Sequence, residues 1–148
     1  MSNTPAKVTA LARGFTAGAL SGGFNLLYFY AYLAATELSV REPTWASVVV
    51  SSLVPCLLAA LGYSWLARRT ARADVYFALV VAAIVITSFE GALRTTLPDG
   101  SLKPPGFDGL VMPMHVVVGL AAALVIPPSI GLRLARRARL RLPCVKWE

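Results

Sequence analysis

The chain has 148 residues, of which 57% are hydrophobic and only 14% charged, and its formal net charge is +7. A soluble domain of this size could not hide so many apolar side chains, because too much of its surface faces water, and an ordinary soluble chain is about 25% charged. The composition therefore excludes a soluble globular domain and predicts a membrane protein. The sequence contains no phosphate-binding loop, nucleotide-binding glycine fingerprint, GxSxG or HExxH motif, so we expect no catalytic residues.

The first apolar stretch, about residues 14–35, is long enough to cross the ~30 Å hydrocarbon core as a helix. Gly14, Gly18 and Gly22 recur at intervals of four, and Asn25 lies beside the same face. Small residues at this spacing let helix backbones pack closely in lipid, within one chain or between two. Its apolar core is longer than the 7–15 residues of a signal peptide, so we expect a retained helix.

The second stretch, about residues 45–66, begins with Trp45, which is typical of a membrane interface. Its predicted packing stripe consists of Ser47, Ser51, Pro55, Ala59 and Tyr63. Pro55 removes one backbone hydrogen bond, so it should kink the helix near the middle of the membrane.

The third stretch, about residues 74–93, carries Glu90 four positions before Arg94, an order that favours an ion pair on one helix face. This face continues through Thr87 and is the least apolar of the helix. We therefore expect it to turn toward the interior of the bundle.

The fourth stretch, about residues 110–132, contains the single histidine of the chain, His115, near its outer end. Gly119 and Ala123, four apart, predict another close helix contact. The loop that precedes this helix is rich in proline and glycine, which is typical of a surface turn and also of a lid over a site.

These elements predict an all-α membrane protein, a single domain of four transmembrane helices in an up-down-up-down bundle. Most of the 14 basic residues fall on one side, in three groups. The groups are Lys7 and Arg13, then Arg68, Arg69 and Arg72, then a basic tail over residues 133–148. The positive-inside rule places both termini in the cytoplasm and the protein in the inner (plasma) membrane. Lipid headgroups are the expected contact of the tail, and no nucleic acid is expected.

Ionisable residues within a span are costly and often functional. Glu90, Arg94 and His115 are predicted to lie at similar depth and to converge, with Asn25 deeper, and His115 would bond Glu90 or a backbone carbonyl. The cluster could be a structural strut that fixes helix register, or a ligand-binding or proton-linked site. One histidine and one carboxylate are too few ligands for a structural zinc, so we expect neither a metal nor another cofactor.

The segment "MPMHVVVGLAAALVIP", which opens the last helix, resembles the corresponding segment of small bacterial four-span membrane proteins whose activity is not established. The resemblance implies the helix arrangement and no activity. The leading hypothesis is a non-catalytic membrane protein that self-associates or serves as an accessory subunit of a larger membrane complex. The alternatives are a carrier for a small hydrophobic or proton-linked ligand and a quinone-site or redox subunit.

Overall fold

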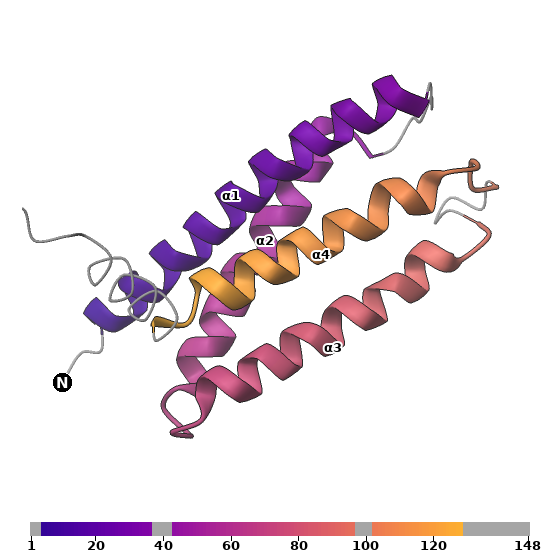
Figure 1. Ribbon diagram of the computed structural model, residues 1–148. Helices are drawn as coiled ribbons and strands as arrows, with labels where there is room; N and C mark the ends of the chain where they lie inside the picture. Colours follow the sequence, from indigo (N-terminus) through magenta and orange to yellow (C-terminus); the bar gives the residue numbers. More distant parts are fainter. Residues whose placement is uncertain (1–3, 37–42, 97–101, 129–148) are drawn as a thin grey trace, which may run out of the picture.

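The computed structural model describes residues 4–36, 43–96 and 102–128, and within the first helix it describes side chains from Thr9 onward. Every regular element of this part of the chain is a helix (Figure 1). The helices are α1 (Thr4–Thr36), α2 (Trp45–Leu66), α3 (Ala73–Leu93) and α4 (Phe107–Val125). Consecutive helices run in opposite directions, so α1 begins and α4 ends at the same end of the bundle (Figure 1). The predicted all-helical, up-down-up-down arrangement is confirmed.

Three helices, α2, α3 and α4, are long and apolar enough to cross a membrane. In each of them, at most 22% of the most apolar stretch is buried inside the bundle. Large apolar side chains therefore cover the outside of these helices, among them Val50, Leu58, Leu79, Ile84, Ile86, Leu120 and Leu124. Such an exterior is stable in lipid and not in water, which identifies these helices as those of an integral membrane protein.

Helices α1 and α4 have bounds that differ from the sequence prediction. Helix α1 begins at Thr4 because alanine, lysine, leucine and arginine, all good helix formers, continue the helix beyond its apolar part. Helix α4 begins after Gly106, whose φ of 85° suits glycine, and it ends at Val125. Pro127 and Pro128 lack the amide hydrogens that another helical turn would use. The predicted amphipathic extension of this helix into the tail lies outside the described residues.

The glycine stripe of α1 packs against α2 of the same chain. A Cβ atom on Gly14 would lie 2.7 Å from Cβ of Ala60 and 2.9 Å from the carbonyl oxygen of Cys56. A Cβ on Gly18 would lie 2.8 Å from Cα of Leu53, whereas one on Gly22 would make ordinary contact with Ser52 at 3.6 Å. At Gly14 and Gly18 the two backbones therefore approach as closely as the absence of a side chain allows.

The buried face of α2 is one residue away from the predicted stripe. It consists of Val48, Ser52, Cys56, Ala60 and Tyr63. Of the predicted stripe, Tyr63 is buried and Ser47 and Ala59 are half-buried. Ser51 and Pro55 are exposed, so the predicted face was wrong by about one residue. The spacing of small residues fixes the period of a helix face, but two adjacent faces of α2 are both rich in serine and alanine. The helix is continuous through Pro55.

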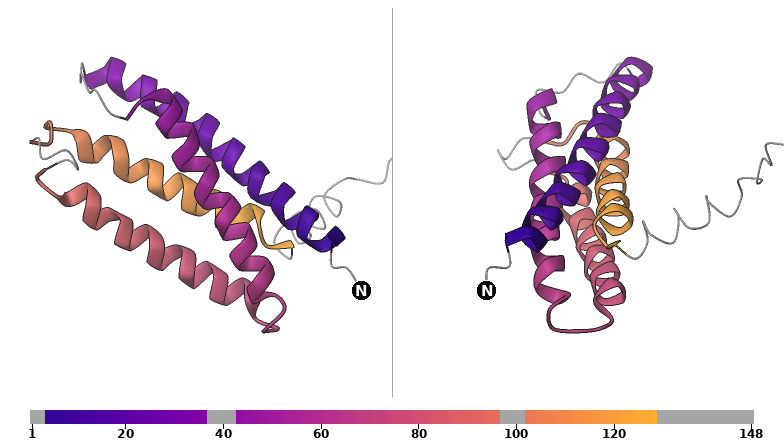
Figure 2. Two further views of the ribbon diagram at one scale, coloured as in Figure 1. Left: turned by 180° about the vertical axis from the view of Figure 1, so that it is seen from behind. Right: turned by 90° about the vertical axis from the view of Figure 1, so that its left-hand side faces the viewer.

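Helix α3 lies at the edge of the bundle. Helix α4 packs between α1 and α3, and α3 has few contacts with α2 (Figures 1 and 2). The close contact that Gly119 predicts for α4 is made with α3, because a Cβ on Gly119 would overlap Cγ2 of Val85. The buried residues of α3 are Ala73, Phe77, Val81 and Ala92, so α3 buries only a narrow strip.

Candidate functional site

Asn25, which is 2% exposed, lies inside the bundle and is larger than the other buried polar residues of the described chain, Ser21 and Ser52. Its Nδ2 donates one hydrogen bond to Oγ of Ser52 at 3.1 Å and one to the carbonyl oxygen of Met114 at 3.3 Å. The side chain thereby links α1 to both α2 and α4. Buried amides in lipid need such partners, because no water is present to replace them.

The other amide atom of this side chain, Oδ1 of Asn25, is buried without a hydrogen-bond donor among the described residues. Rotating the amide by 180° would place Oδ1 against the carbonyl oxygen of Met114, and two acceptors would then face each other. The orientation in which Nδ2 donates both hydrogen bonds is therefore the favourable one. A buried acceptor without a donor is unfavourable, and such atoms are found at sites that take up water or a ligand.

His115 is half-buried in the first half of α4, next to the residue whose carbonyl accepts from Asn25. The predicted link between this imidazole and the charged pair of α3 is not formed. Between these described residues, no hydrogen bond or ion pair joins His115 to Glu90 or to Arg94. The four predicted residues therefore do not form one cluster.

Glu90 and Arg94 form the predicted ion pair, with 3.8 Å between Oε1 of Glu90 and Nη2 of Arg94. Their side chains are 78% and 70% exposed, so the prediction that this face turns inward was wrong. Thr87, one turn earlier, is also exposed. The rotation of α3 is set by the fit of Val85 against Gly119, and this fit turns the polar face outward.

A second set of polar contacts ties the helices together at the end of the bundle where α1 and α3 end and α4 begins. Nζ of Lys103, in the loop before α4, donates to the carbonyl oxygen of Ala92 at 2.7 Å and forms an ion pair with Asp108. It thus joins the end of α3 to the first turn of α4, where the helix dipoles favour both charges. On the other side, the hydroxyls of Tyr28 and Tyr32 donate to the carbonyls of Gly109 and Gly106. The described part of this loop therefore holds α1, α3 and α4 together.

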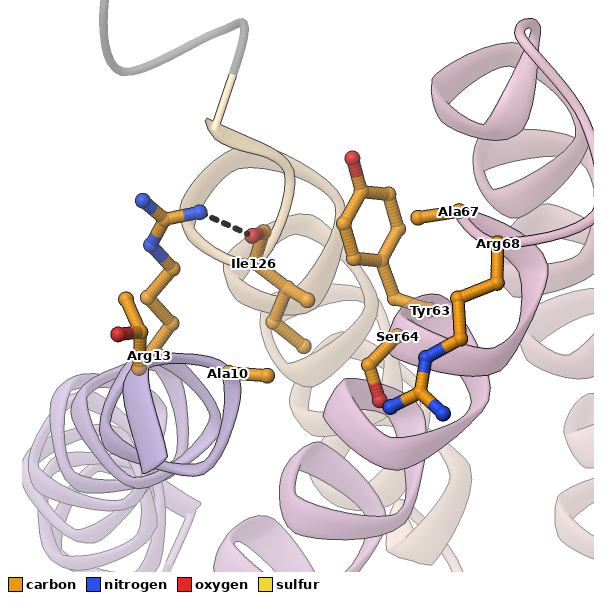
Figure 3. A pocket seen from close by; sticks show the side chains of 8 residues that line it. Ala10, Arg13, Tyr63, Ser64, Ala67, Arg68 and Ile126 are labelled. Carbon is orange, nitrogen blue, oxygen red and sulfur yellow. Dashed lines mark hydrogen bonds between the residues drawn. The ribbon is translucent and has the colours of Figure 1, made fainter. Parts of the chain in front are cut away.

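A pocket opens at the opposite end of the bundle, where α1 begins and α4 ends (Figure 3). It encloses about 200 Å³ between α1, the last turn of α2 and the residue that follows α4. Two arginines line it: Arg13 of α1 is half-buried, and Arg68, in the turn that follows α2, is exposed. Nη1 of Arg13 donates to the carbonyl oxygen of Ile126 at 3.5 Å. In Figure 3 the two guanidinium groups lie on either side of Tyr63, with Arg68 beside Ser64.

The wall of this pocket is held in place by Tyr63, which is 8% exposed. Its hydroxyl donates to Oδ1 of Asp74 in α3 at 2.6 Å, and its ring packs edge-on against Phe77 at 5.2 Å between centroids. The adjacent Arg69 lies over the ring of Trp65 at 4.7 Å and does not line the pocket. Neighbouring arginines are therefore in different environments.

From the sequence, Arg13 and Arg68 were assigned only to membrane orientation, and the pocket was missed. One signal was present: Arg13 directly precedes the first glycine of the packing stripe, so a side chain at that position must lie near the α1–α2 contact. Lys103 was missed because its partners, Ala92 and Asp108, depend on the path of the loop. Within the described ranges, no three His, Cys, Asp or Glu side chains could hold a metal ion.

No family model, curated protein or solved structure matches the chain.

Proposed function

We propose that the protein crosses the membrane four times, with α1 as the fourth span and both termini in the cytoplasm. Helix α1 is less apolar than the others because glycines, tyrosines and Asn25 interrupt it. Its outward side chains are nevertheless large and apolar: Phe15, Leu20, Phe24 and Leu27 are 58–69% exposed. Its polar residues Ser21 and Asn25 are turned inward. This apolar-out, polar-in pattern supports a lipid-facing helix.

The protein's role, in this proposal, is non-catalytic, and it acts by self-association in the membrane along α3. The small-residue seams do not support contact with a second copy, because Gly14 and Gly18 face α2 and Gly119 faces α3. Helix α3 is the helix that the rest of the chain covers least. It is also the one whose exposed face carries a charged pair near its outer end.

The observation that carries this proposal is the outward position of Thr87, Glu90 and Arg94 on one side of α3. Polar side chains that face lipid are unfavourable, and a protein partner relieves that cost. The face is self-complementary, since it bears one acid and one base four residues apart. In a twofold-symmetric pair, Glu90 of each copy can reach Arg94 of the other. A second copy of the chain is therefore the occupant that fits this surface.

Disulfide cross-linking in native membranes tests the proposal, with Cys144 replaced by serine and the buried Cys56 left in place. Thr87→Cys should give a cross-linked dimer on mild oxidation. Phe24→Cys is the matched control, because Phe24 is 62% exposed on the side of α1 that faces away from the bundle, and it should stay monomeric. Equal cross-linking at both positions, or none at Thr87→Cys, would contradict association through α3.

A charge exchange sharpens the same test. Glu90→Arg places two arginines on each copy and should reduce the dimer yield of Thr87→Cys, because like charges then face each other. The double variant Glu90→Arg/Arg94→Glu restores one acid and one base and should recover the yield. If the double variant stays as weak as the single one, the charged pair does not contribute to the interface.

The unpartnered Oδ1 of Asn25 favours a second candidate function, the carriage of a small apolar ligand that bears one hydrogen-bond donor. In that case, denaturing the purified protein should release such a molecule, detectable by mass spectrometry. Asn25→Leu should abolish its recovery, whereas Thr87→Leu, which also replaces a polar residue in a helix, should not. If both variants release the same molecules as the original chain, this candidate fails.

A further inference from the structure

The pocket beside Tyr63 combines features that suit one chemical class of ligand. Arg13 comes from α1 and Arg68 from the turn that follows α2, so the two positive charges are held by different elements around one cavity. A guanidinium group presents five N–H donors in a planar fork that matches the oxygens of a phosphate. The contact of Arg13 with the carbonyl of Ile126 is long, at 3.5 Å, and engages one of its nitrogens. Both arginines thus retain donors for an anion.

The rest of the lining completes an amphipathic site. Ser64 supplies a hydroxyl, whereas Ala10, Ala67 and Ile126 supply apolar surface. Asp74 of α3, whose carboxylate accepts from the hydroxyl of Tyr63, does not line the pocket. A volume of about 200 Å³ is below the ~300–1,000 Å³ of pockets that enclose whole organic ligands. The cavity is therefore of a size for one charged group, with any apolar remainder of the ligand left outside.

The pocket also lies at the level where headgroups are found. It lies against the last turn of α2, the helix end that also carries the exposed Trp65 with Arg69 over its ring. Tryptophan and arginine at a helix end are typical of the membrane interface, and basic pockets between transmembrane helices bind lipid phosphates.

We propose that the pocket between Arg13 and Arg68 binds the phosphate group of an anion, and that an anionic phospholipid of the adjacent leaflet presents it. Each arginine gives charge-assisted hydrogen bonds to the phosphate oxygens. The site goes beyond the proposed association of copies. No residue of α3 lines it, so the two proposals fail independently.

Native mass spectrometry of the detergent-solubilised full chain tests this site, with phosphatidylglycerol and inorganic phosphate as separate probes. We expect one tightly bound phosphatidylglycerol per chain. Arg13→Gln and Arg68→Gln should each weaken it about tenfold, as the loss of a charge-assisted hydrogen bond predicts. Arg69→Gln is the matched control: it removes the same charge one residue away, outside the pocket, and should leave binding unchanged.

The outcomes separate the alternatives. Inorganic phosphate bound through Arg68, with no phosphatidylglycerol bound, would overturn the lipid assignment and give the phosphate site to a soluble ligand. Equal loss of binding in Arg68→Gln and Arg69→Gln would overturn the proposal in favour of diffuse attraction between basic residues and lipid. Unchanged binding in Arg68→Gln would also overturn it. Because Arg68 is exposed, this variant should fold, and it tests the proposal even if Arg13→Gln does not fold.

Discussion

The contact between α1 and α2 and the contact between α3 and α4 both use glycine, yet they are built differently. In the first, Gly18 brings backbone against backbone, since an added Cβ would lie 2.8 Å from Cα of Leu53. In the second, Gly119 receives a side chain, that of Val85. The first contact is continuous over several turns, whereas α3 is otherwise largely exposed.

This difference shows how a membrane bundle can have a rigid part and a peripheral part. Neither pair gains from burying apolar surface, because lipid is as apolar as the partner helix, so close packing and polar contacts decide stability. The α1–α2 pair has both, with Asn25 and Ser52 bonded at its centre. Helix α3 is attached by the fit of Val85, by the Lys103 contact at one end, and by the contacts of Tyr63 with Asp74 and Phe77 at the other. It is therefore the helix freest to meet another protein.

The largest effect is expected from Gly18→Ala, which should destabilise the α1–α2 contact by about 3 kcal/mol, the upper part of the range for overpacking. The added Cβ meets backbone atoms, which cannot rotate away as a side chain can. Denaturant unfolding in mixed micelles measures the change. Gly23→Ala is the control, because nothing lies within 4 Å of its added Cβ. If the two variants are equally stable, the seam is not in close contact.

A smaller effect is expected where the end of α3 is attached to the start of α4. Lys103→Gln removes the charged donor shared by the carbonyl of Ala92 and the carboxylate of Asp108, which should cost about 1–2 kcal/mol. Arg94→Gln breaks an ion pair that is largely exposed and should change stability by less than ~0.5 kcal/mol. Unfolding of the two variants under the same conditions compares them. Equal losses would mean that the buried position of Lys103, whose side chain is 13% exposed, has no importance.

The smallest effect on packing is expected at Gly119→Ala, about 1 kcal/mol, because the atom in the way is the end of the Val85 side chain. Shortening that side chain in Gly119→Ala/Val85→Ala should recover part of the loss, and a double-mutant cycle measures the recovery. Strictly additive losses would show that the two residues do not touch.

The sequence predicts the number, order and alternating direction of the helices, because apolar length and charged breaks are local properties. It does not predict which way each helix is rotated. On α3 the polar face that includes Glu90 was expected inside and lies outside. The inward face is chosen by the fit of Val85 to a glycine on another helix, which no property of α3 itself reveals. On α2 the buried face was misplaced by one residue for the same reason.

The candidate site shows the same limit. Asn25 is recognisable from the sequence because an amide within an apolar helix must find partners, and it does find them in Ser52 and Met114. The pocket at Arg13 and Arg68 is not recognisable from the sequence, because each arginine taken alone indicates only the orientation of the helices in the membrane. Their proximity depends on where α1 crosses the end of α2.

The central claim is that α1 lies in lipid as the fourth span, and spin labels on its outer face test it most directly. Single labels at Leu20→Cys and Phe24→Cys, with Cys144 replaced by serine, can be measured in reconstituted vesicles for collisions with oxygen and with a water-soluble nickel chelate. Both positions should collide with oxygen and be shielded from the chelate, as should a label at Ile84→Cys in α3. If Leu20→Cys and Phe24→Cys collide freely with the chelate while Ile84→Cys does not, α1 lies outside the membrane and the claim is wrong.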